Sequence, residues 1–114
     1  MTDQTRDILQ EISTQVSQND VVLYMKGSHD MPMCGFSSVI VQILNKLNIE
    51  FKDVDVLQDQ EIREGIKKFS NWPTIPQLYV KGEFIGGCDI TKELYESGEL
   101  VQFLQNKGIT IQAN

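Results

Sequence analysis

The sequence predicts an α/β fold in which a four-stranded mixed sheet carries helices on both faces. Three observations favour this fold. A continuous apolar run over residues 21–25 is typical of a strand that is buried on both faces. Residues 51–56 alternate apolar and polar side chains with the period of a strand. A hairpin pattern covers residues 77–87, and segments with helical spacing flank all three. The predicted order is α, β, α, β, α, β, β, α, α, with a right-handed first β-α-β unit.

The N-terminal segment, residues 4–17, is predicted to be an amphipathic helix that ends at Asn19-Asp20. The strand at 21–25 follows directly. We expect the apolar stripe of this helix to pack against the sheet, because its members recur at helical spacing. They are Ile8, Leu9, Ile12 and Val16.

Residues 26–33 are predicted to form a loop, because Gly27 and Pro32 interrupt any regular pattern there. A second helix begins at Cys34 and ends near Asn48. Its apolar stripe consists of Val39, Ile40, Ile43, Leu44 and Leu47. The cysteine therefore lies where a β-α connection meets the first turn of a helix.

The second half of the chain repeats these signals. After the strand at 51–56, Asp59 precedes a helical segment with apolar residues on one face. The sequence NWPTIP then ends this helical pattern. We predict a tight turn at Gly82-Glu83 between two short strands. The predicted elements are a helix at 59–70, strands at 77–81 and 84–87, and helices at 90–97 and 99–106.

The composition fits one soluble domain that spans residues 1–114, without internal repeats or linkers. The net charge of −6 argues against nucleic-acid binding, which needs a positive face. No apolar run is long enough for a membrane span, and the N-terminus has neither the basic start nor the apolar stretch of a signal peptide. We therefore expect a cytoplasmic protein with reduced thiols that binds neither nucleic acid nor membrane.

Cys34 is the candidate reactive residue. The N-terminus of a helix favours negative charge, and Lys26 at the end of the preceding strand adds a cation nearby, so both lower the pKa of the thiol. Gly35 permits the close approach of another molecule. The structural alternative is a packed core cysteine. The flanking Pro32 and Gly35 favour the reactive interpretation.

Position 37 decides what this cysteine can do. A dithiol redox motif would have a second cysteine there, but the residue is Ser37. Cys34 therefore cannot release a mixed disulfide by local ring closure. Either an external thiol completes the exchange, or the thiolate is a metal ligand. Two cysteines and one histidine cannot form a closed four-ligand zinc site, so a metal would be shared between chains or completed by an outside ligand.

Three further features are candidates for a binding groove. The prolines of WPTIP, at 72–76, suggest a fixed backbone edge, although an ordinary rigid loop is the alternative. The sequence GGCD, at 86–89, precedes a helix whose free N–H groups can receive a carboxylate. Here the alternatives are that Asp89 is an N-cap and that Cys88 is simply packed. Arg63 lies off the apolar stripe of its helix and is a candidate for the groove. The alternative is an ordinary solvated arginine.

Four sequence blocks together resemble the monothiol glutaredoxin family, within the thioredoxin fold. They are KG at 26–27, CGFS at 34–37, NWPTIPQLYV at 71–80 and GEFIGGCDI at 82–90. The blocks occur in the order and spacing of the family, and the resemblance covers essentially residues 6–108. CGFS alone is a short match, whereas the four blocks together are highly specific.

The resemblance implies that the protein binds glutathione along a groove and holds a [2Fe-2S] cluster between two subunits. Each subunit would supply Cys34 as a ligand, and each bound glutathione would supply its own thiolate. It also implies that Lys26 and Arg63 pair with the glycine carboxylate of glutathione.

The same resemblance assigns the rest of the glutathione molecule. Ile75, ahead of a family cis-proline at Pro76, would hydrogen-bond the cysteine moiety through its backbone. Cys88 and Asp89 would hold the γ-glutamyl end at a helix start. The family also associates with BolA-type proteins, which can replace one subunit around a cluster.

We therefore expect a carrier that assembles a cluster and passes it to iron-sulfur acceptor proteins, as a homodimer or with another protein. Delivery, storage and sensing are all compatible with this role. The alternative is an enzyme, a weak glutathione-dependent thiol-disulfide oxidoreductase that uses Cys34 as the nucleophile. A third hypothesis is a redox-regulated interaction module in which Cys34 and Cys88 form a disulfide.

Overall fold

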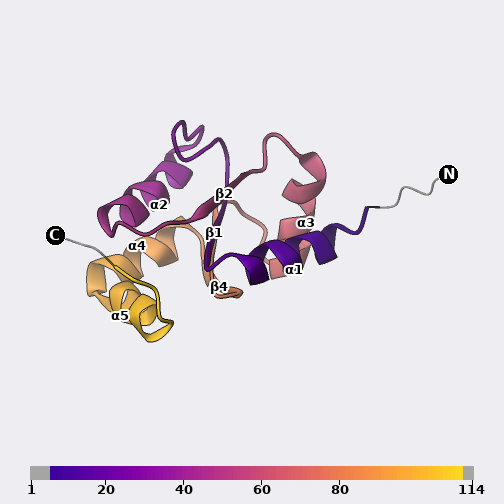
Figure 1. Ribbon diagram of the computed structural model, residues 1–114. Coiled ribbons are helices and arrows are strands. Elements are labelled where there is room, and N and C mark those ends of the chain that lie inside the picture. Colours follow the sequence, from indigo (N-terminus) through magenta and orange to yellow (C-terminus); the bar gives the residue numbers. More distant parts are fainter. Residues whose placement is uncertain (1–5, 112–114) are drawn as a thin grey trace.

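The computed structural model describes residues 6–111, and its sheet lies between two groups of helices (Figure 1). The strands are arranged in the order β2-β1-β3-β4. β1 and β2 are parallel, whereas β1 with β3 and β3 with β4 are antiparallel. The predicted four-stranded mixed sheet is therefore confirmed. The strands are β1 (Val21–Met25), β2 (Lys52–Asp55), β3 (Gln77–Val80) and β4 (Glu83–Gly86).

The helices cover both faces of the sheet, as predicted. α1 and α3 lie on one side, and α2, α4 and α5 lie on the other (Figure 1). Their bounds are α1 (Ile8–Gln18), α2 (Gly35–Lys46), α3 (Gln60–Ser70), α4 (Cys88–Ser97) and α5 (Glu99–Asn106). Within residues 6–111, none of the helices has both the length and the apolar character needed to cross a bilayer.

The first helix differs from the prediction in two ways. It begins at Ile8, and residues 4 and 5 of the predicted segment lie outside the described residues. Ile12 and Val16 are buried, but Leu9 is 47% exposed and does not belong to the buried stripe. Leu9 lies only about 20° around the helix axis from the buried Val16, so its exposure follows from its place in the first turn, where the helix begins, and not from its direction.

β1 divides the core into two parts. Val21, Leu23 and Met25 pack with α2 and α5, whereas Val22 and Tyr24 pack with α1 and α3. Every residue of this strand is buried, which confirms the prediction of a strand covered on both faces. Its C-terminal end leads directly to the loop that carries Cys34.

The hairpin turn lies one residue earlier than predicted. Lys81 and Gly82 have φ values of 52° and 81°, and Glu83 already belongs to β4. Two central residues with positive φ are the signature of a type I′ turn, in which glycine prefers the second position. The expected turn at Gly82-Glu83 is therefore wrong by one position.

α3 is fixed at both ends and packs closely against α1. Asp59 caps its start by accepting hydrogen bonds from the N–H groups of Glu61 and Ile62, at 3.1 and 3.2 Å. Asn71, in the left-handed conformation, ends it. Between the caps, Gly65 lies against Ile8, and a methyl group on Gly65 would overlap the Cγ2 atom of Ile8. This packing matters for the site because α3 also carries Arg63.

Candidate functional site

Cys34 is the N-cap residue of α2, as the sequence predicts. The pKa of its thiol lies below the ordinary value, chiefly because the backbone N–H of Ser37 hydrogen-bonds the sulfur. Partial burial opposes this shift, and the N–H of Phe36 and the charge of Lys26 reinforce it. The first turn of α2 thus favours the thiolate, which is the reactive and metal-binding form of cysteine.

The thiol opens onto a groove of about 350 Å³ between the start of α2, α3 and the loop before β3. Three of its lining residues are cations, namely Lys26, Arg63 and Lys67. In a chain with a net charge of −6, this local concentration of positive charge favours an anionic ligand. The complete lining is Lys26, Cys34, Phe36, Arg63, Lys67, Pro73, Thr74 and Ile75.

The loop 72–76 forms another wall of the groove, and its Ile75-Pro76 peptide bond is cis. The buried side chain of Gln77 holds this loop from inside. Its amide nitrogen donates to the carbonyl groups of Trp72 and Thr74, at 3.2 and 3.1 Å. The backbone edge that the two prolines suggested is therefore fixed by a residue that the sequence analysis did not single out.

Ser37 has a structural role in addition to its lack of a thiol. Its side chain is fully buried, and its hydroxyl oxygen accepts a hydrogen bond from the backbone N–H of Lys26 at 3.2 Å. This bond connects the end of β1 to the first turn of α2. It therefore fixes Lys26 relative to Cys34.

Cys88 and Asp89 lie in the first turn of α4 and do not line this groove. Burial and the charge of Asp89 raise the pKa of the Cys88 thiol, opposite to the shift at Cys34. Both cysteines are free thiols. Gly87 is the N-cap, so the alternative that Asp89 caps the helix is wrong. Among the described residues no side chain caps the N–H groups of this first turn.

The structure thus brings four of the six predicted site residues into one groove: Lys26, Cys34, Arg63 and Ile75. It adds Lys67, which the sequence analysis missed. Lys67 lies four residues after Arg63 on α3, and residues at this spacing share one helix face, so the spacing could have identified it.

Exposed apolar side chains lie on both sides of Cys34 in the chain. Met31, Met33 and Phe36, next to Cys34 in the chain, are 68, 64 and 62% exposed. Exposed apolar groups around a reactive thiol are typical of a surface that contacts another molecule.

Comparison with known proteins agrees with these features. The glutaredoxin family model matches residues 21–85. The chain is 56% identical over 99 residues to "Probable monothiol glutaredoxin 2" of Rickettsia typhi, covering 87% of this chain and 89% of that protein.

Two solved structures have the same fold. A monomeric truncated mutant of 1-C-Grx1 from Trypanosoma brucei is 38% identical, with a TM-score of 0.86 over 96% of this chain and 100% of that one. A buckwheat glutaredoxin in complex with glutathione is 25% identical, with a TM-score of 0.78 over 89% of this chain and 90% of that one. The predicted thioredoxin fold is thereby confirmed, and the chain belongs to the glutaredoxin family, in its monothiol group.

Proposed function

We propose that this monothiol glutaredoxin binds glutathione in the groove beside Cys34. The observation that carries the proposal is that one groove contains a cysteine with a lowered thiol pKa, three cations and a fixed backbone edge. Glutathione is a thiol with two carboxylates, which this combination suits. The buckwheat relative, whose structure contains glutathione, supports the assignment.

The groove and the start of α4 together would offer a partner for each part of glutathione. Lys26 and Arg63 would hold the glycine carboxylate, and the backbone of Ile75 would bond the cysteine moiety. The γ-glutamyl end would extend to Cys88 and Asp89, where the uncapped N–H groups of α4 can donate hydrogen bonds to a carboxylate. The thiol of glutathione would then lie close to Cys34.

We further propose that two subunits share a [2Fe-2S] cluster, the cargo that the protein delivers to acceptor proteins. The donor set fits sharing, because among residues 6–111 no group of three or more His, Cys, Asp or Glu side chains could hold a metal. Each chain offers the soft thiolate of Cys34, and two glutathione thiolates would complete four ligands. The exposed Met31, Met33 and Phe36 would face the second subunit or a BolA-type partner in its place. We place this activity in the cytoplasm, where thiols stay reduced.

A second candidate function is glutathione-dependent disulfide exchange. The lowered pKa of Cys34 favours it, because the thiolate attacks a mixed disulfide. The buried Ser37 provides no resolving thiol, so each cycle would need an external glutathione. This activity uses the same groove and the same thiolate, so it belongs to the form of the protein that holds no cluster.

Reconstitution with iron, sulfide and glutathione under anaerobic conditions tests the carrier role. We expect visible absorbance and bound iron in the wild type, none in Cys34→Ser, and most of both in Cys88→Ser, the matched control. A hydroxyl is a poor ligand for iron. Full iron in Cys34→Ser would show that the ligands lie elsewhere and would overturn the proposal.

A further inference from the structure

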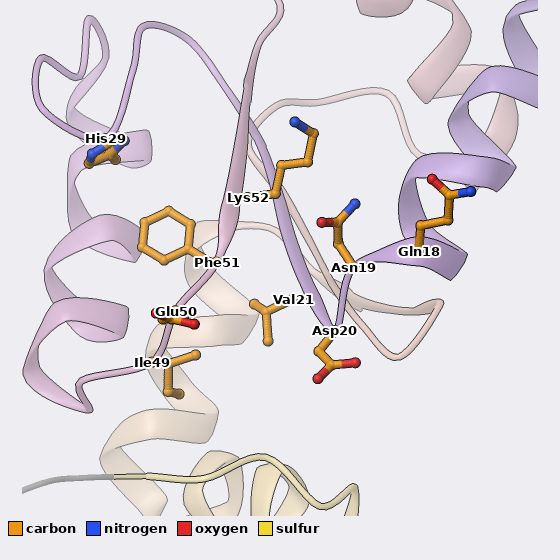
Figure 2. Close-up of a pocket in the computed structure, with 9 residues that line it drawn as sticks. All are labelled: Gln18, Asn19, Asp20, Val21, His29, Ile49, Glu50, Phe51 and Lys52. Carbon is orange, nitrogen blue, oxygen red and sulfur yellow. The ribbon is translucent and has the colours of Figure 1, made fainter.

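The sheet has two edge strands, β2 and β4, and β2 is protected against pairing with another chain. Lys52, its first residue, is exposed and places a charge on the edge (Figure 2). The N–H of His29 donates to Asp53 at 2.8 Å, so the loop that follows β1 lies against this strand. The N–H of Gln58 donates to the carbonyl of Asp55 at 3.1 Å and occupies part of the outer backbone edge. Charged side chains and covering segments are common means of preventing edge-to-edge pairing.

β4, at the other side of the sheet, has an open backbone edge. Tyr79 and Phe84 are the second pair beyond the two-residue turn, a position at which antiparallel partners do not bond each other. The N–H and C=O groups of Phe84 therefore point away from β3. Within residues 6–111, no backbone group outside the β3–β4 ladder bonds this strand. An extended segment of another chain would find one donor and one acceptor there.

A groove of about 250 Å³ lies beside this edge, between β4 and the helices α4 and α5. Its apolar lining includes Ile85, Leu94 and Phe103, which are all half-buried. The carboxylates of Glu83 and Glu99 are exposed at its rim, and none of the lining residues is a cation. An apolar groove with an acidic rim favours an apolar segment that also carries Lys or Arg.

A cation of this chain already makes the contacts that such a segment would make. Lys107 follows the end of α5, and its Nζ lies 3.0 Å from Oε1 of Glu83 and 5.5 Å from the centre of the Phe103 ring. An ion pair and a cation–π contact are the interactions that a basic side chain from another molecule would form here. Because exposed ion pairs contribute at most about 1 kcal/mol, a second cation can displace Lys107 at little cost.

We propose that β4 and this groove form a docking surface for an extended segment of another protein, in which a Lys or Arg lies two residues from an apolar side chain. At this spacing both side chains face the groove. The segment adds to the open edge at Phe84, its apolar side chain contacts Phe103, and its cation replaces Lys107 beside Glu83. This surface shares no lining residue with the groove beside Cys34, so the proposal goes beyond the proposed function and does not depend on it.

The test is an NMR titration of the ¹⁵N-labelled protein, without glutathione or iron, with the acetylated and amidated peptide Ser-Lys-Val-Leu-Thr-Arg. We expect saturable shifts at the amides of residues 83–86, Leu94 and Phe103. The same peptide with Glu in place of Lys and Arg should bind about fivefold more weakly or less. Shifts confined to the groove beside Cys34, or equal binding of the two peptides, would overturn the proposal. Shifts at residues 83–86 that depend on protein concentration alone would assign the edge to a second copy of this chain and would also overturn it.

Lys107→Gln distinguishes an internal competitor from an ion pair that only stabilises the fold. The variant frees Glu83 and Phe103, so the affinity for the basic peptide should rise about two- to fivefold, the range of an exposed ion pair. Glu83→Gln should lower it by a similar factor. Lys46→Gln removes the same charge from the last turn of α2 and is the matched control, with an affinity close to that of the wild type. An affinity that does not rise in Lys107→Gln, or that rises equally in Lys46→Gln, would contradict the docking geometry, whereas glutathione and cluster binding would be unaffected.

Discussion

Ser37 shows how one residue combines a chemical and a structural consequence. Its hydroxyl cannot resolve a mixed disulfide, and it accepts the N–H of Lys26 from a fully buried position. The sequence alone predicts the first consequence, because that depends only on the spacing from Cys34. The second depends on where the end of β1 meets α2, which the spacing does not reveal.

We predict that Ser37→Cys raises the rate of disulfide reduction and lowers the free energy of unfolding by about 0.5–1.5 kcal/mol. The new thiol is a resolving group, but sulfur is a weak acceptor for the N–H of Lys26. A reductase assay and urea unfolding measure the two effects. Ser38→Cys, one position along, is the control. Equal reductase rates in the wild type and Ser37→Cys would show that position 37 does not limit the exchange.

Arg63 is one of the three cations that lead us to propose an anionic ligand for the groove. We predict that Arg63→Glu weakens glutathione binding by roughly 1.5–3 kcal/mol, because a charge-assisted hydrogen bond to the carboxylate is lost. Isothermal titration calorimetry gives the affinity. Lys46→Glu makes the same change of charge in the last turn of α2, away from the groove, and should have little effect. If both variants bind glutathione equally well, Arg63 does not belong to the site.

At the scale of the elements, the position of α3 depends on its contact with α1. The guanidinium of Arg6 joins the starts of the two helices, with contacts to Glu11 at 2.6 Å, Asp59 at 2.8 Å and Glu61 at 3.2 Å. Gly65 allows Ile8 to approach the backbone of α3. Because Arg63 and Lys67 lie on α3, this packing also sets one side of the groove.

We predict that Gly65→Ala lowers the free energy of unfolding by about 1–2 kcal/mol. Overpacking against Ile8 costs about 1–3 kcal/mol, and the better helix propensity of alanine offsets part of this. Chemical denaturation of the wild type, both single variants and Gly65→Ala combined with Ile8→Ala measures the coupling. Removing the Ile8 branch should relieve the overlap, so the double variant should lose less stability than the sum. Strict additivity would contradict the close contact.

At the scale of the whole molecule, the order and type of the elements could be predicted from the sequence, because the apolar run of β1 and the helical stripes are strong local signals. The exact hairpin turn could not, because Lys81 adopts a conformation that its residue type disfavours. The contacts of Gln77 with the 72–76 loop and of Asp55 with Gly27 could not be predicted from the sequence either. They join segments that become neighbours only once the sheet has formed.

The central claim, that two chains share one cluster through Cys34 and glutathione, is tested most directly by native mass spectrometry. The protein is reconstituted anaerobically with iron, sulfide and glutathione and measured without denaturation. We predict a species with the mass of two chains, two glutathione molecules and one [2Fe-2S] cluster, which becomes apo-monomer when glutathione is removed. A single chain that carries the cluster, or a cluster-bound dimer that contains no glutathione, would contradict the claim.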